Sequence, residues 1–425
     1  MNLSDVYIQT IIISTMIIVS YFFNFIARKT NIPSVLLLIG LGIGIHEIMK
    51  VMDFDFDYFI MEALELVGVV GLIMIVLEGA LDLELKKEKR PLLIKSFLVA
   101  LFSLVITTVG IAFILNEYLF NDYFTSLLYA IPLSILSSAI IIPSVGHLIP
   151  TKKEFLVYES TFSDILGIMF FYFLIGNSES SSAMKIITDV SGGIALTIAL
   201  SLVISYTLVI LLQRLHAKVK LFFLIAVLVL LYSTGKMFHL SSLLIILVFG
   251  LVLRNYSIFF KGRLIKLINK EALHEIKEDF HIVTMESAFV VRTFFFIIFG
   301  VTLNFAGIVN TTTILLSLAI LVLMYIVRYI LLKIFVRKNI TPQQWIAPRG
   351  LITILLFFSI PVEYANSNFN AAILLFVILT SSMIMSIGLM AKKEDFDERE
   401  KLTFDDWEAL DREIEDLNRH LADKN

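Results

Sequence analysis

The sequence predicts an all-α polytopic membrane protein. Of its 425 residues, 58% are hydrophobic and only 17% are charged, and the mean hydropathy is +0.90. A soluble chain of this length could not bury so much apolar surface. Apolar runs of about 20 residues also recur along the chain, and this is the length that a helix needs to cross a bilayer. These observations place the protein in a membrane.

About thirteen transmembrane helices are expected from the apolar runs. They are residues 6–27, 32–49, 59–83, 92–116, 124–148, 155–176, 185–212, 219–236, 239–254, 281–306, 312–334, 342–363 and 369–391. The first has no basic residues before it and is interpreted as a retained span, not a signal peptide. The membrane domain is thus residues 1–391. Residues 392–425 are predicted to form an acidic tail with one amphipathic helix.

Basic residues are concentrated in every second predicted loop. They follow the odd-numbered spans, at residues 28–29, 86–90, 152–153, 213–220, 254–270, 333–338 and 392–393. Because loops rich in Lys and Arg stay in the cytoplasm, the N-terminus is expected outside and the C-terminus in the cytoplasm of a plasma (inner) membrane. The amphipathic, basic segment 257–280 is expected to lie along the cytoplasmic face.

Two predicted spans contain helix breakers. The fifth reads "LSSAIIIPSVGHL" with Pro143, and the twelfth reads "QQWIAPRGLITILL" with Pro348 and Gly350 around Arg349. Proline removes a backbone donor and clashes with the preceding turn, so each helix is expected to break there. If spans 1–6 and 8–13 form an inverted repeat, the two breaks correspond. Paired discontinuous helices that cross near the midplane are typical of a transporter's binding site.

The sixth span, "VYESTFSDILGIMFFYFL", carries Glu159 and Asp164. A carboxylate in hydrocarbon costs roughly 2.5 to 3.5 kcal/mol even on lenient scales, so a functional role is the default interpretation. At the helical repeat, Ser160 and Asp164 share a face, with Ser163 beside them, while Glu159 points elsewhere. Oxygen ligands of this kind suit a hard cation. The alternative is a purely structural ion-pair network.

Glu159 needs a cationic partner of its own, and the residues alone leave Arg292, Arg328, Arg349 and Lys95 as candidates. Glu78, near the end of the third span, is either part of an ion funnel or an interfacial carboxylate. Glu286 and Arg292 lie six residues apart on one predicted helix, so they cannot face each other. Each is expected to find a partner on another helix.

The chain resembles the cation:proton antiporters, specifically the electroneutral sodium/proton exchanger branch. The stretches that carry the resemblance are "IPSVLLLIGLGIGI", "LEGALDLEL", "ESTFSD" and "WIAPRGLI". The resemblance implies that Asp164 is the alternating cation and proton site and that Ser160 is a ligand. It also implies that Glu159 pairs with Arg328, that Arg349 belongs to the twelfth-span Arg-Gly motif, and that Glu78 lines the cytoplasmic funnel. The family fold implies a core domain that moves against a dimerisation domain, in a homodimer.

Two departures from the family pattern stand out. Ser163 occupies a position where the family usually has asparagine. Ile141 and Ile142 occupy the places of the family's Thr-Asp, so only backbone carbonyls near them are expected as ligands.

The predicted function is exchange of one monovalent cation for one proton, contributing to pH homeostasis. The ion is Na⁺ first, with Li⁺ or K⁺ as alternatives, because hydroxyls, carbonyls and one carboxylate suit all three. No covalent chemistry, cofactor or nucleic-acid partner is expected, so the protein is predicted to be a transporter and not an enzyme. Two alternatives remain, an ion-coupled transporter of an organic solute and a non-transporting membrane sensor on the same scaffold.

Overall fold

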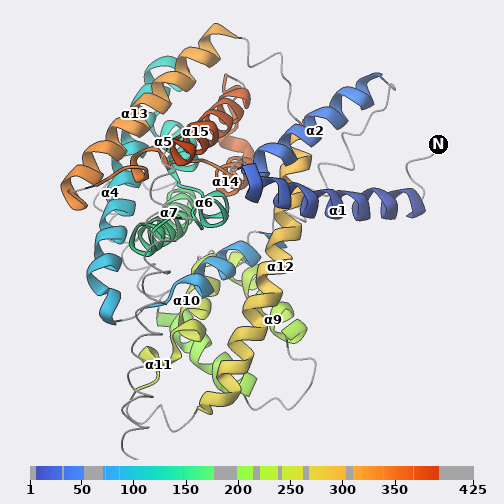
Figure 1. The fold of residues 1–425 in the computed structure, drawn as a ribbon, viewed down its shortest axis with the longest axis vertical. Helices are drawn as coiled ribbons and strands as arrows, with labels where there is room; N and C mark the ends of the chain where they lie inside the picture. The colour runs from blue at the N-terminus through green and yellow to red at the C-terminus, as the bar shows by residue number, and fades with distance from the viewer. Residues whose placement is uncertain are drawn as a thin grey trace, which may run out of the picture.

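The computed structural model describes residues 6–30, 33–51, 70–71, 73–85, 87–146, 148–176, 199–213, 221–237, 242–261, 268–302, 310–337, 339–366 and 368–391. Within these ranges every regular element is a helix (Figure 1), so the predicted all-α class is confirmed. In the part of the chain that the structure describes, seven helices are long and apolar enough to cross a membrane, and four shorter apolar helices accompany them. The predicted total of thirteen spans stays a prediction. The tail 392–425 lies outside the described residues.

The described helices overlap each predicted span, some over only part of its length. They are α1 (Val6–Thr30), α2 (Ser34–Val51), an unlabelled helix at 70–82, α4 (Arg90–Leu115), α5 (Tyr123–Ser134), α6 (Ser138–Ser144), α7 (Pro150–Gly176), an unlabelled helix at 199–213, α9 (Leu221–Met237), α10 (Ser242–Arg254), α11 (Tyr256–Phe259), α12 (Lys270–Thr302), α13 (Thr311–Phe335), α14 (Leu351–Phe358) and α15 (Ala372–Met390). A π-helical turn at Asn116–Phe120 extends α4, and 3₁₀ turns lie at Lys87–Lys89, Gln343–Trp345 and Val362–Tyr364.

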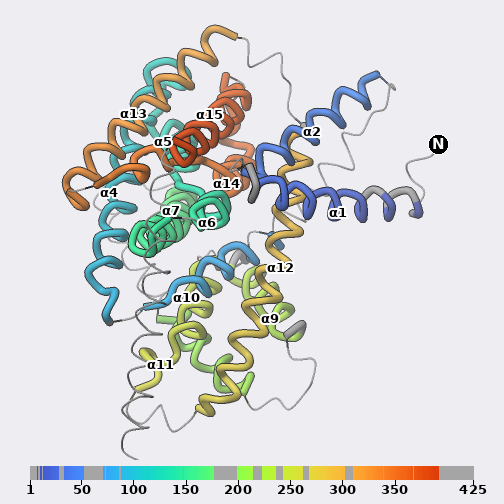
Figure 2. The backbone as a smooth tube through the Cα atoms, viewed as in Figure 1, coloured from blue at the N-terminus to red at the C-terminus, as the bar shows by residue number. Residues whose placement is uncertain are grey.

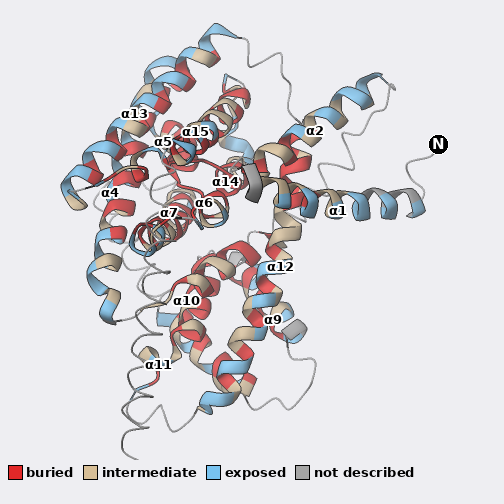
Figure 3. Cartoon of the chain, viewed as in Figure 1, coloured by how far each residue is buried: buried red, intermediate tan, exposed pale blue. Residues whose placement is uncertain are grey.

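The helices form two groups (Figures 1 and 2). Helices α4 to α7 lie with α13, α14 and α15, while α9 and α10 lie with the lower half of α12. In the most apolar stretch of the Tyr123–Ser144 span, 83% of the residues are buried, against 22% of the residues in the corresponding stretch of α2. Figure 3 shows the same contrast between the buried centre and the exposed outer faces of α1, α2 and α13. A span with so little lipid-facing surface can carry polar groups and irregular backbone.

Helices α2 and α12 cross at two glycines. A Cβ atom added at Gly42 would lie 2.1 Å from the carbonyl oxygen of Ile297, and one added at Gly300 would lie 2.4 Å from that of Ile39. Small residues at a crossing let membrane helices approach backbone to backbone, which increases their van der Waals contact. The crossing fixes α12 against the N-terminal helices.

Residues 270–280, the second half of the basic segment 257–280, are not a separate surface helix, so the prediction is wrong for them. Residues from Lys270 onward are the start of α12, which continues unbroken for 33 residues to Thr302. At a rise of about 1.5 Å per residue such a helix is longer than the hydrocarbon core, so its polar start projects beyond the apolar part. The amphipathic pattern therefore marks the polar extension of a spanning helix.

Candidate ion-binding site

The fifth span is interrupted between α5 and α6, at residues 135–137. Each backbone N–H freed there has a partner. Ile135 N donates to the carbonyl of Pro132 at 3.5 Å and Ser137 N to that of Pro348 at 3.0 Å. Leu136 N donates to the Ser163 hydroxyl at 2.9 Å, and Ser138 N donates to Asp164 Oδ2 at 3.1 Å. Irregular backbone at membrane depth requires such internal partners.

The predicted position of this break, at Pro143, is wrong. Pro143 lies inside α6, one residue before that helix ends at Ser144, and the chain leaves helical geometry six residues or more earlier. A proline near the end of a short helix costs one backbone hydrogen bond but does not have to bend a long run. Ile141 and Ile142 thus lie within α6, and the Ile141 carbonyl accepts from Val145 N at 3.0 Å. The backbone that contacts Asp164 is that of Ser138.

The twelfth span is interrupted at residues 346–350, between the 3₁₀ turn and α14. Pro348 lies in this extended segment, where the sequence predicted a break, and its carbonyl accepts the Ser137 N–H. The two interrupted spans therefore touch at their irregular segments. Arg349 is buried there, with Nε donating to the Leu133 carbonyl at 2.7 Å and Nη1 to the Ala347 carbonyl at 3.0 Å. A guanidinium is favourable beside the C-terminal carbonyls of α5.

Gly350 permits the close contact between the two irregular segments. A Cβ atom at this position would lie 2.3 Å from the Ser137 hydroxyl and 2.9 Å from Ser137 Cβ and from Ile140 Cδ1. We expect Gly350→Ala to lower the thermal stability by about 1 to 3 kcal/mol, as overpacking typically does. Ser137→Gly removes two of the three clashing atoms at small cost to an N-cap. The double variant should therefore be more stable than Gly350→Ala when melting is measured in detergent. Equal melting of the two would mean that this contact is not limiting.

Asp164 lies beside the first interruption, on α7, and is 6% exposed. Its Oδ2 atom accepts the Ser138 N–H, while its Oδ1 atom is buried without a hydrogen-bond partner among the described residues. The same holds for the hydroxyl of Thr161, one turn earlier on α7. A buried carboxylate with one unsatisfied oxygen is unfavourable unless a proton or a cation neutralises it.

Ser160 and Ser163, the predicted hydroxyl ligands, are both buried on α7. Ser163 Oγ accepts the Leu136 N–H, which places it at the interruption. Ser160 Oγ donates to the Val157 carbonyl of its own helix at 3.2 Å. A hydroxyl oxygen has two lone pairs, so both retain acceptor capacity for a cation.

Glu159 forms a bidentate ion pair with Arg328 of α13. The two oxygen–nitrogen distances are 2.9 and 3.2 Å, and the side chains are 0% and 2% exposed. Arg328 Nε also donates to the Gln343 carbonyl at 2.8 Å, in the turn that leads to the second interruption. Of the four basic partners that the sequence left open, Arg328 is thus the one in contact. Lys95, another of these candidates, is exposed on α4.

Three further ionisable residues of the described spans, Glu78, Arg292 and Glu286, contact side chains of other helices. Arg292 of α12 holds Glu78 of the 70–82 helix, at 2.8 and 3.1 Å. Glu286 of α12 accepts the Tyr21 hydroxyl of α1 at 2.7 Å. Glu286 and Arg292 do not pair with each other, and each finds its partner on another helix, as their spacing indicated.

Sequence reasoning missed the groups that complete the interruption. Ser138 supplies its N–H to Asp164, and Ser381 Oγ accepts the Arg349 N–H at 3.1 Å. The pair Ser137-Ser138 could have indicated the break, because serine is typical of helix N-caps and not of helix interiors.

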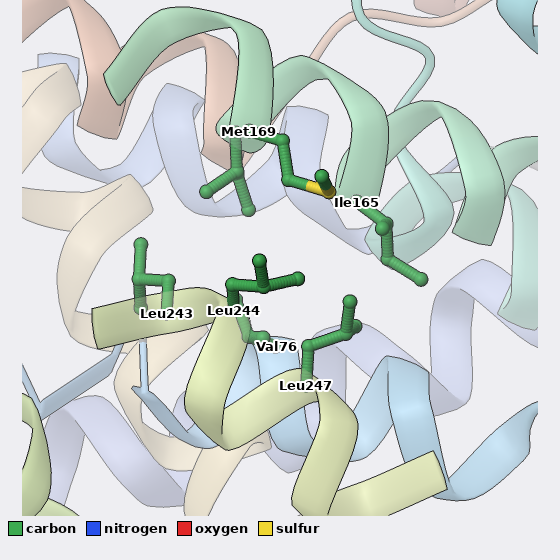
Figure 4. Close-up of a pocket in the computed structure, with 7 residues that line it drawn as sticks. Val76, Ile165, Met169, Leu243, Leu244 and Leu247 are labelled. Carbon is green, nitrogen blue, oxygen red and sulfur yellow. The ribbon is translucent and has the colours of Figure 1, made fainter. Parts of the chain in front are cut away.

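An apolar pocket lies one turn beyond Asp164, between α7, α10 and the 70–82 helix (Figure 4). Its lining residues are Val76, Ile165, Ile168, Met169, Leu243, Leu244 and Leu247.

Comparisons with known proteins agree with this arrangement. Residues 12–391 match the family model described as sodium/hydrogen exchanger, transmembrane. Two solved structures of the sodium proton antiporter MjNhaP1 of Methanocaldococcus jannaschii have a similar fold. One is 20% identical with a TM-score of 0.64 and covers 89% of this chain and 92% of its own. The other is 18% identical with a TM-score of 0.62 and covers 91% and 96%.

A search of curated protein sequences gave no match. The family model nevertheless spans almost the whole membrane domain, including both interrupted spans and Asp164. The chain is thus a membrane-embedded cation:proton antiporter that belongs to the sodium/hydrogen exchanger family.

Proposed function

We propose that the protein exchanges one monovalent cation for one proton by alternating access at Asp164. Na⁺ is the first candidate ion, with Li⁺ and K⁺ as alternatives. The observation that carries the proposal is the buried Asp164 Oδ1 atom without a hydrogen-bond partner among the described residues, at the junction of two interrupted spans. A carboxylate oxygen in this position is available to either a cation or a proton.

The proposed ligands are oxygen atoms around that carboxylate. Asp164 supplies the charge, Ser160 and Ser163 supply hydroxyls, and backbone carbonyls of the interrupted fifth span complete the shell. The sequence assigned these carbonyls to the region of Ile141 and Ile142, whereas the contacts of Ser138 and Leu136 favour residues 135–138. Such a set of neutral oxygens and one carboxylate suits a hard cation of single charge.

Transport then follows from the cost of moving a bare charge. A buried carboxylate is unfavourable in its charged form, so the ion site would cross between the two sides only when neutralised by a cation or a proton. Each half-cycle would carry one of the two ions. The Glu159–Arg328 pair keeps Glu159 ionised, because protonating Glu159 would leave the buried Arg328 guanidinium without a counter-charge. Only Asp164 is left to trade ions in the ligand cluster.

The wider assembly is also part of the proposal. The Lys and Arg residues of the loops favour an external N-terminus and a cytoplasmic C-terminus in the plasma (inner) membrane. The family fold favours a homodimer in which the remaining helices hold a moving core. Pro143, Pro348, Arg349 and Glu78 would support the site without binding the ion.

The stoichiometry gives a test in proteoliposomes. A proton gradient is imposed, and its dissipation is followed by dequenching of a pH-sensitive dye after Na⁺, Li⁺ or K⁺ is added. We expect cation-dependent proton movement whose rate hardly changes when valinomycin and K⁺ clamp the membrane potential at different values, because equal charges move in opposite directions.

Two outcomes would count against the proposal. A rate that depends steeply on the clamped potential means that a second charge moves in each cycle. Absence of proton movement with all three ions, from protein that is folded and correctly inserted, would exclude monovalent cation exchange.

A further inference from the structure

The Glu78–Arg292 pair lies between the 70–82 helix and α12, and the proposed function gives no role to Arg292. It is bidentate, with side chains that are 13% and 19% exposed. One turn further along the 70–82 helix, Asp82 contacts His281 of the same α12 at 2.8 Å. Two side-chain contacts thus join these helices. A bidentate guanidinium–carboxylate pair fixes the orientation of both side chains.

The neighbours of Glu78 pack its helix against the part of α7 that holds Asp164, while the Glu78 side chain itself meets α12. A Cβ atom added at Gly79 would lie 3.5 Å from Thr161 Cγ2, one turn before Asp164. Val76 lines the apolar pocket together with Ile165 and Ile168, just after Asp164 (Figure 4). The contacts on either side of Glu78 therefore lie on either side of Asp164 along α7.

We propose that Arg292 is a positioning residue for ion exchange, which holds Glu78 between its own helix and α12, cancels its charge and thereby sets the cation affinity of Asp164. This inference rests on the proposed function. In this proposal neither Arg292 nor Glu78 contacts the transported ion. The pair acts through the electrostatic potential at the site, where packed helices lie about 8 to 10 Å apart and a unit charge is only partly screened.

The competition between cation and proton gives the proposal a distinctive signature. An extra negative charge near Asp164 strengthens the binding of Na⁺ and of H⁺ by the same factor. At alkaline pH, where few sites are protonated, the half-saturating Na⁺ concentration falls by that factor. At acidic pH, where the two ions compete, the two gains cancel and the half-saturating concentration stays the same. A general disturbance of the fold would not produce this pattern.

The test uses Arg292→Gln, Glu78→Gln and the double variant in proteoliposomes, with the half-saturating Na⁺ concentration measured at alkaline and at acidic pH. At alkaline pH we expect Arg292→Gln to lower it about tenfold and Glu78→Gln to raise it by a similar factor, as for a unit charge at helix-packing distance. The double variant should lie near the wild type, and Arg292→Lys should retain most of the wild-type affinity. At acidic pH all four should converge.

Arg254→Gln is the matched control, since it removes a guanidinium whose contacts, with Glu84 and Glu278 at 3.9 Å, lie at the far end of α10. It should leave the half-saturating concentration within twofold of the wild type. Shifts of the same sign in Arg292→Gln and Glu78→Gln, or no shift in either, would overturn the inference while wild-type exchange still supports the proposed function. Loss of exchange in the wild type would instead overturn the proposed function itself.

Discussion

Replacing Asp164 with asparagine is expected to abolish cation-dependent proton movement. Asparagine keeps the size of the side chain and an oxygen that can accept the Ser138 N–H, so the contact at the interruption survives. It cannot carry a proton in exchange for a cation, and it cannot provide the charge that balances one. We therefore expect a folded, membrane-inserted protein whose dye signal with Na⁺, Li⁺ or K⁺ equals that of empty liposomes.

Asp122→Asn is the control for this substitution. Asp122 caps α5 and accepts the Thr125 N–H at 2.9 Å, a role that asparagine also fills. The control should keep wild-type exchange, and both variants should elute and melt like the wild type in detergent. Appreciable cation-dependent proton flux in the Asp164 variant would exclude Asp164 as the obligate carrier.

The second large effect is expected on stability, from the Glu159–Arg328 pair. Removing one partner leaves a buried, unpaired charge and typically costs about 3 to 5 kcal/mol. Glu159→Ala and Arg328→Ala should each lower the melting temperature strongly. Arg328→Ala should be at least as severe, because the Gln343 carbonyl also loses its donor.

The double variant separates an interaction from two independent losses. Because neither buried charge then remains, its destabilisation should be smaller than the sum of the two single effects, with a coupling energy of roughly 0.5 to 3 kcal/mol. Thermal melting of the four proteins in the same detergent measures this coupling. Additive effects would show that the observed contact contributes nothing to folding, whatever its geometry.

Patterns of charge along the chain predicted that ionisable residues inside the spans need partners, but not which partners they have. An arginine or a carboxylate inside a membrane span must find a partner, and few partners exist in such an apolar chain. Arg292 and Glu286 were correctly separated by helical spacing alone. Which residue on another helix each one meets could not be deduced, because the spacing within one helix holds no information on how helices pack. The pairing of Arg292 with Glu78 is of this kind.

The interruption of the fifth span shows a different limit. Proline is a strong local signal for a helix break, and for this reason the break was expected at Pro143. The backbone instead leaves the helix where partners exist on other elements, at Ser163 of α7 and at the Pro348 carbonyl. These partners belong to distant parts of the sequence. Local propensity thus indicated that the span breaks, and tertiary hydrogen bonds determined where it does so.

The central claim is that one carboxylate holds either a cation or a proton, and proton release on cation binding tests it most directly. Purified protein is titrated with NaCl in calorimetric runs with buffers of different ionisation enthalpy, against choline chloride as the salt control. At a pH where the empty site is protonated, we predict about one proton released for each Na⁺ bound, and none from Asp164→Asn. Na⁺ binding without proton release, or release that persists in Asp164→Asn, would contradict the account.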